Sequence, residues 1–179
     1  MGKTFEEITS ELADWIARQR LFFVATAPMA ETGLLNCSPK GMDSFRVLGP
    51  RTVGYLDLTG SGIETVAHLQ ENGRIAFMFC AFEGPPKIVR LQGVGNVITP
   101  ESAEFDDLKS KFPNHAGARA IIRAELTRIS DSCGYGVPKF TYVEERDALT
   151  QSIQKKGTDG LIRYRQEKNA HSLDGLPGL

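Results

Sequence analysis

Three short segments of the sequence carry residues that suit the binding of a small anion. The first is Ser38-Pro39-Lys40-Gly41, which follows an apolar run. Proline fixes one backbone angle and glycine permits a tight turn, so backbone amides and the Lys40 ammonium can face one point. An ordinary surface turn with a solvated lysine explains the same residues.

The second segment runs from Asp57 to Ile63, where a predicted strand enters a loop of small residues: Thr59, Gly60, Ser61 and Gly62. The glycines let the backbone approach a ligand, and the hydroxyls are hydrogen-bond donors. The N-terminus of a following helix adds free amides that favour phosphate. The segment is neither a Walker loop nor a dinucleotide fingerprint, because it lacks GxxxxGK(S/T) and GxGxxG. A helix cap after a tight turn is the alternative interpretation.

The third segment contains Arg90, which stands in the middle of an apolar strand between Lys87 and Gly93. A guanidinium is expensive to bury without a partner, so Arg90 requires an anion or a solvated face. An internal ion pair or simple exposure meets that requirement as well as a ligand does.

Other chemistry has weaker signals in this chain. The three histidines lie on separate predicted elements, and the three cysteines are widely spaced: His68, His115, His171, Cys37, Cys80 and Cys133. An odd number of cysteines without CxxC pairs argues against disulfides and zinc, so we expect no metal site. We place His68 on a helix surface and Cys80, in an apolar run, in the interior as an inert thiol. No catalytic acid, base or nucleophile is identified.

Composition limits the classes of partner. The 179 residues fit a single domain, with a mobile tail expected from residue 169. A net charge of −1, from 21 basic and 22 acidic residues, argues against nucleic acid. The apolar runs are far shorter than the roughly 18 residues needed to cross a bilayer, and the N-terminus is too polar for a secretory signal. We therefore expect a cytoplasmic protein without a membrane partner.

The elements that must position the three segments are mostly short strands. A helix is predicted over 4–19, with a capping box at Thr4 and Glu7. Strands are predicted over residues 21–27, 34–38, 45–48, 52–58, 74–82, 87–98 and 120–129, and further helices over 63–70, 100–108 and 144–156. Glycine and proline between the short strands predict a mainly β (α+β) fold with a closed or sandwiched antiparallel sheet.

From about Phe5 to Lys156 the chain resembles the pyridoxamine 5′-phosphate oxidase-like family of FMN-binding split barrels. The segments that carry the resemblance are Asn36–Gly41, Val53–Ser61, Glu71–Phe77 and Ile88–Gly93. It implies a six-stranded antiparallel split β-barrel with flanking helices. It also implies a homodimer with FMN in clefts between the subunits. We expected Phe77, Phe79 and Phe82 to be exposed and to favour such a dimer.

The resemblance also implies roles for the three segments. Ser38 to Gly41 would lie along the flavin, with Lys40 as counter-ion of its phosphate. Asp57 to Ser61 would line the ribityl chain and phosphate, and Arg90 would reach the flavin or its phosphate from the next long strand. The implied function is an FMN-dependent oxidoreductase acting on a small molecule. The alternative is a non-catalytic module that binds flavin, deazaflavin or tetrapyrrole on the same barrel.

Two features depart from the family pattern. Many relatives have two basic residues after the small-residue loop, whereas this chain has Gly62-Ile63-Glu64. Compensation for that lost charge was expected from Lys40, Arg90 or a partner's residue equivalent to Arg123. The chain also ends without the arginine-rich segment that holds the substrate phosphate in pyridoxamine phosphate oxidases. Oxidation of vitamin B6 is therefore not the expected activity.

Overall fold

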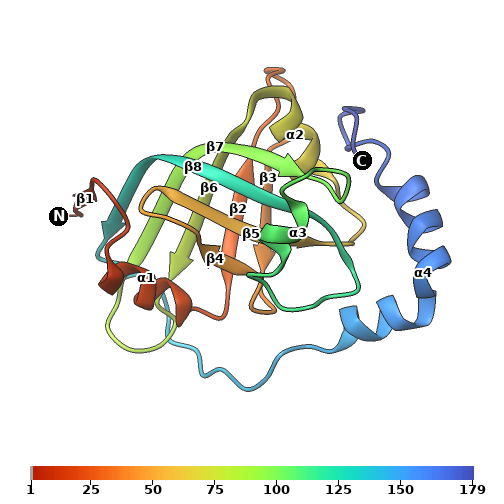
Figure 1. Cartoon of the computed structure of the whole chain (residues 1–179). Coiled ribbons are helices and arrows are strands. Elements are labelled where there is room, and N and C mark those ends of the chain that lie inside the picture. Colours follow the sequence, from red (N-terminus) through yellow and green to blue (C-terminus); the bar gives the residue numbers. More distant parts are fainter. Residues whose placement is uncertain (1) are drawn as a thin grey trace.

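The computed structural model describes residues 2–179, in which one antiparallel sheet curls around a hydrophobic core (Figure 1). The strands are β1 (Thr4–Phe5), β2 (Phe22–Thr26), β3 (Asn36–Lys40), β4 (Phe45–Val47), β5 (Thr52–Leu58), β6 (Arg74–Cys80), β7 (Ile88–Ile98) and β8 (Ala118–Ser132). The helices are α1 (Ser10–Ala17), α2 (Glu64–Asn72), α3 (Phe105–Lys109) and α4 (Ala148–Lys168).

The strands of the described residues follow the order β3-β2-β6-β7-β8-β5-β4, and β1 pairs with β8. All these pairings are antiparallel, which confirms the predicted class of fold. The described sheet has eight strands, more than the six that the family resemblance implies. The two-residue β1 is too short to show the alternation of apolar and polar residues by which a strand is recognised in sequence.

The core forms on the concave face of the sheet, where alternate residues of β6 and β7 point inward. Phe77 and Phe79 are 0% and 1% exposed, so the expectation that they are exposed was wrong. Their rings pack against Tyr55 and Phe22, at centroid distances of 6.1 Å and 5.6 Å. Successive side chains of a strand face opposite sides, which places both rings inside. These two rings therefore give no reason for dimerisation.

The N-terminal helix is shorter than predicted because part of it is a strand. Thr4 and Phe5 pair with β8, and α1 begins only at Ser10. The N-cap is Thr9, whose hydroxyl accepts a hydrogen bond from the Leu12 amide at 3.3 Å. The capping box expected at Thr4 was therefore wrong, since strand pairing prevails there over local helix signals.

The C-terminal segment also differs from its expected form. Helix α4 extends to Lys168, well beyond the predicted end at 156, with a non-helical Gly157 in its course (φ 63°). The segment predicted as a mobile tail has defined contacts: Asn169 is fully buried, and His171 forms a β-bridge with Pro177. Figure 1 shows α4 beside the barrel, with the C-terminus turning back toward α2.

Among residues 2–179, no helix is both long enough and apolar enough to cross a membrane.

Candidate functional site

A buried ion pair between Asp57 and Arg119 forms the centre of the candidate site. Asp57 lies near the end of β5, and Arg119 lies near the start of β8. Arg119 Nε donates to Asp57 Oδ2 at 2.7 Å, and the side chains are 4% and 1% exposed. A buried charge is expensive unless it is paired and hydrogen-bonded, so each residue requires the other.

An irregularity in the β5–β8 pairing brings these two side chains together. Asp57 pairs with Ala120 and Leu58 with Ala118, so Arg119 is the extra residue of a β-bulge. Bulges redirect side chains, and they are frequent beside functional sites. Here the bulge directs the Arg119 guanidinium toward the carboxylate of Asp57.

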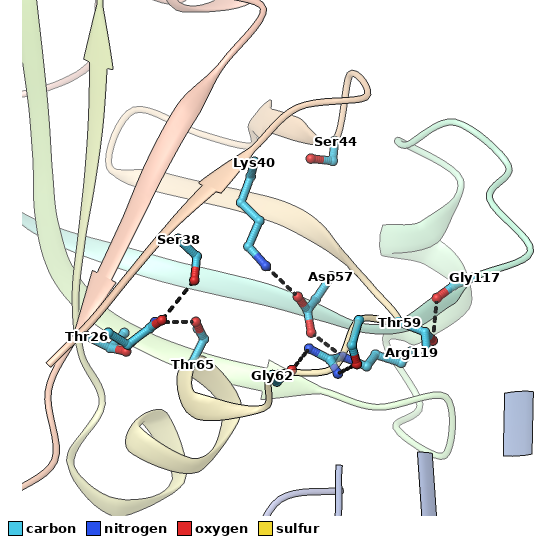
Figure 2. Close-up of polar contacts among 12 residues, drawn as sticks. Thr26, Ser38, Lys40, Ser44, Asp57, Thr59, Gly62, Thr65, Gly117 and Arg119 are labelled. Atoms are coloured by element: carbon cyan, nitrogen blue, oxygen red, sulfur yellow. Dashed lines mark hydrogen bonds and ion pairs between the residues drawn. The ribbon is translucent and has the colours of Figure 1, made fainter. Parts of the chain in front are cut away.

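Lys40 approaches the same carboxylate from the edge strand β3. Its Nζ lies 3.4 Å from Asp57 Oδ1 and 5.7 Å from the centroid of the Tyr55 ring. Lys40 faces inward because its register partner, Phe22, belongs to the core. Figure 2 shows Lys40 and Arg119 reaching Asp57 from different sides. An ammonium has three N–H donors. The bond to Asp57 Oδ1 is the one hydrogen bond that Lys40 Nζ makes among the described residues.

Arg119 also holds the carbonyl groups of the small-residue turn. Its Nη2 donates to the Gly62 carbonyl at 2.8 Å, and its Nη1 donates to Asn169 Oδ1 at 2.8 Å. Asn169 Nδ2 in turn donates to the Gly60 carbonyl at 3.0 Å. The amides of Gly60, Ser61 and Gly62 donate to no residue within 2–179. A turn with held carbonyls and free amides is suited to an anion.

Thr59 is occupied by contacts within the protein. Its hydroxyl, 4% exposed as a residue, donates to the Gly117 carbonyl at 2.8 Å and accepts from Arg165 Nε at 2.9 Å. Arg165 Nη2 also donates to the Ala118 carbonyl at 3.0 Å. The Thr59 hydroxyl was expected to contact a ligand, whereas the structure uses it to join β5, the loop before β8 and α4.

The site carries more positive than negative charge. Three basic residues lie in the site: Lys40 and Arg119 pair with Asp57, and Arg165 reaches the neighbouring Thr59. Burial, and next the neighbouring Arg119, lower the pKa of Arg165. Glu64 folds back toward Gly62, where a β-carbon would lie 2.5 Å from its Oε2. Even with Glu64 counted, cations outnumber carboxylates, which favours an anionic ligand.

The compensation expected for Glu64 comes only in part from the expected residues. Lys40 lies in the site, but Arg123 pairs with Glu104 instead. Arg90 lies on the outward face of β7, because its neighbours Val89 and Leu91 fill the core. Its Nη1 donates to Ser132 Oγ at 3.0 Å. Within one chain, Arg90 therefore does not converge with Lys40 and the turn, and its place beside the flavin stays a prediction.

The remaining residues of the first segment lie on both faces of β3. Ser38 points inward like Lys40, and its hydroxyl donates to Asn36 Oδ1 at 2.8 Å. Pro39 is exposed on the outward face, and Gly41 follows the strand, half-buried. Only Ser38 and Lys40 of this segment therefore face the candidate site.

A buried polar network continues from Ser38 to helix α2. Asn36 Nδ2 donates to the hydroxyls of Thr26 and Thr65, at 3.1 Å and 3.0 Å. Thr26 Oγ1 lies 2.9 Å from His68 Nδ1. His68 is 0% exposed, so its expected place on the helix surface was wrong. Burial lowers its pKa, although the acidic Asp174, Glu64 and Glu71 oppose that shift.

Cys80 is buried, as predicted, and burial raises its pKa.

Tyr55 lies beneath Lys40 and is fully buried. Burial, and next the negative charge of Asp57, raise its pKa well above the ordinary value for tyrosine. The phenol therefore stays protonated near neutral pH.

Sequence reasoning missed Arg119, Arg165 and Asn169. Arg119 had the same signal as Arg90, a lone guanidinium in an apolar strand, and could have been found by that criterion. Arg165 and Asn169 contact the turn only through tertiary packing, and their neighbours in sequence are ordinary polar residues of a charged helix. No local pattern distinguishes them.

The fold and the site define an antiparallel split β-barrel with a cationic cluster between strands β3 and β5. Residues 8–133 match the family model described as pyridoxamine 5′-phosphate oxidase. The chain belongs to that family.

One relative agrees with this assignment, and two solved structures share the fold. The pyridoxamine 5′-phosphate oxidase family protein ustO of Aspergillus flavus is 38% identical over 194 residues, covering 98% of this chain and 77% of the relative. HupZ of Group A Streptococcus is 26% identical, with a TM-score of 0.54 over 70% of this chain and 99% of that chain. An FAD-binding protein of Mesorhizobium loti is 11% identical and shares the fold, with a TM-score of 0.51 over 73% of this chain and 96% of that chain.

Replacing Arg119 with methionine is expected to destabilise the protein strongly. The change leaves Asp57 buried with only Lys40 near it, and loss of one partner of a buried pair costs about 3–5 kcal/mol. The free energy of unfolding in urea measures the effect. The matched control is Arg123→Met, which breaks a more exposed ion pair with Glu104 and should cost at most about 1 kcal/mol. Equal losses in the two variants would contradict a central role for Asp57–Arg119.

His68 is expected to make stability depend on pH below neutrality. Its folded-state pKa is lowered, so the unfolded chain binds the proton more readily. Stability is therefore complete above about pH 6.5 and falls as the pH drops toward the folded pKa, by up to about 1.4 kcal/mol per pH unit. Unfolding between pH 7.5 and 5.5 should show a shallower dependence in His68→Asn. Replacement of the exposed His171 should leave the dependence unchanged, and identical slopes in wild type and His68→Asn would refute the assignment.

Proposed function

We propose that this chain binds a flavin mononucleotide and uses it in an oxidoreductase reaction on a small molecule. The observation that carries the proposal is the cationic cluster at Asp57, where Lys40 has unused donors beside a turn with free amides. A phosphate dianion is the ligand that such a cluster favours. Membership of the pyridoxamine 5′-phosphate oxidase family supports a flavin as the molecule that carries this phosphate.

The residues present fit such a group. A β-carbon at Gly60 would meet no atom within 4 Å, so the space over the turn is open to a ligand. The phosphate would take hydrogen bonds from Lys40 Nζ and from the amides of residues 60–62. Arg119 would hold the turn in place from beneath, with each of its three nitrogen atoms already donating to a protein acceptor.

The bound flavin would exchange a hydride with the substrate, so the protein need supply only binding and orientation. Lys40 would place positive charge near the cofactor, and Tyr55 beneath it would remain a neutral phenol. A carrier without turnover is the competing function. Stopped-flow mixing of the flavin-loaded protein with NADH or NADPH separates the two, because only the oxidoreductase is expected to show reduction of the flavin.

Replacing Lys40 with methionine is expected to weaken FMN binding about tenfold or more, because a charge-assisted hydrogen bond to the phosphate is lost. Riboflavin has no phosphate, so its weaker binding should hardly change. Quenching of flavin fluorescence on titration measures both affinities, and FAD in the same assay tests the dinucleotide.

The matched control is Lys87→Met. Lys87 is also a half-buried lysine near a carboxylate, Asp131, at 3.8 Å, but it lies outside the cluster. The Lys87→Met substitution should leave FMN affinity unchanged. No quenching by micromolar FMN in the wild-type protein would end the flavin proposal, and equal weakening of FMN and riboflavin would remove Lys40 from the phosphate site.

We also propose that the chain forms a homodimer with the flavin at the subunit interface. Large apolar side chains stand exposed on the loop before β3 and on the segment after β8, among them Leu35 at 83%, Phe140 at 60% and Val143 at 83%. Exposed large apolar side chains favour association. Light scattering coupled to size exclusion should give twice the mass of the 19.7 kDa chain. A monomer mass at micromolar concentration would contradict the dimer.

A further inference from the structure

A cavity lies between α4 and the segment that leads into β8. It has a volume of about 270 Å³, and its walls are mainly apolar side chains: Ala116, Ala118, Ile153, Leu161 and Ile162. Ile153 and Leu161 are the two buried residues of α4, each 6% exposed. The helix break at Gly157 lies on the same lining. The size of the cavity and its apolar lining suit a small ligand.

One charged group borders this apolar space. Arg165 lines the cavity and is half-buried. Two of its nitrogen atoms are used, Nε by Thr59 and Nη2 by the Ala118 carbonyl, while Nη1 donates to no residue within 2–179. No carboxylate of the described residues lies within ion-pair distance of this guanidinium.

The charge of Arg165 is therefore poorly compensated. Asp57, the nearest candidate, is already shared by Arg119 and Lys40. A second guanidinium, that of Arg119, stands close enough to help lower the pKa of Arg165. A half-buried cation without a counter-ion, facing an apolar cavity, is suited to bind an anion from outside the chain.

We propose that this cavity binds a small aliphatic carboxylic acid, with its carboxylate on Arg165 and its hydrocarbon chain against the apolar walls. The described lining of the cavity includes neither Lys40 nor any residue of the turn at 60–62. The site is therefore separate from the proposed flavin phosphate site, although Thr59 joins the two. If the flavin proposal holds, the acid would lie next to the phosphate end of the cofactor site.

The experiment is isothermal titration of the full chain with hexanoate, with 1-hexanol as the uncharged probe of the same length. Hexanoate should bind, and hexanol should bind at least tenfold more weakly because it lacks the charge-assisted hydrogen bond. Arg165→Met should weaken hexanoate about tenfold or more, and Arg165→Lys should restore part of the affinity. The matched control, Arg163→Met, removes an exposed arginine of the same helix and should change affinity less than about twofold.

A variant that fills the cavity tests the position of the hydrocarbon chain without a change of charge. Ala116→Phe should abolish hexanoate binding while FMN titration stays as in the wild type. The proposal is overturned if hexanoate fails to bind at millimolar concentration, if hexanol binds equally well, or if Arg165→Met binds hexanoate as the wild type does.

Parallel FMN titrations keep this outcome distinct from failure of the flavin proposal. Arg165→Met should weaken FMN binding far less than Lys40→Met does, because Arg165 adds only long-range positive charge and makes no proposed contact with the phosphate. Loss of FMN with unchanged hexanoate binding would assign Arg165 to the flavin phosphate and reject the acid site. If the wild-type protein binds hexanoate but does not bind FMN, the result would support the acid site and contradict the flavin proposal.

Discussion

The buried ion pair of Asp57 and Arg119 is the constraint on which the rest of the site depends. Removing two charges from water is costly, and in a protein interior the cost is recovered only with close pairing and further hydrogen bonds. Asp57 meets this requirement with Arg119 and Lys40, and Arg119 meets it with Asp57, the turn carbonyls and Asn169. Strands β3, β5 and β8 and the end of α4 must therefore all be in place before the pair is satisfied.

The same constraint produces the chemical character of the turn. Because Arg119 and Asn169 hold the carbonyl groups, the amides of residues 60–62 are left for a ligand. The structure thus builds an anion site without the pair of basic residues that many relatives carry after this loop. Lys40, a cation from the distant strand β3, takes the place of a charge that is absent at Gly62 and Ile63, and Arg165 on α4 adds positive charge at longer range. Glu64 is tolerated because the cluster remains positive.

The sheet was predictable from sequence, and the centre of the site was not. The β-type run Thr52–Leu58 and the loop of small residues after it predicted β5 with its observed bounds. Lys40 and Asp57 were both found, because a turn residue and a strand end are local features. Arg119 depends on a bulge, which no local pattern specified. Arg90 was expected beside Lys40 because its chemistry was considered without the face of the strand, and within the chain Val89 and Leu91 direct it outward.

The most direct test of the account is a crystal structure of the chain grown with FMN. The account predicts the phosphate within hydrogen-bond distance of Lys40 Nζ and of the amides of residues 60–62, with Arg119 still bound to Asp57 beneath the turn. A flavin phosphate bound elsewhere on the barrel, with Lys40 and this turn free of ligand, would contradict it.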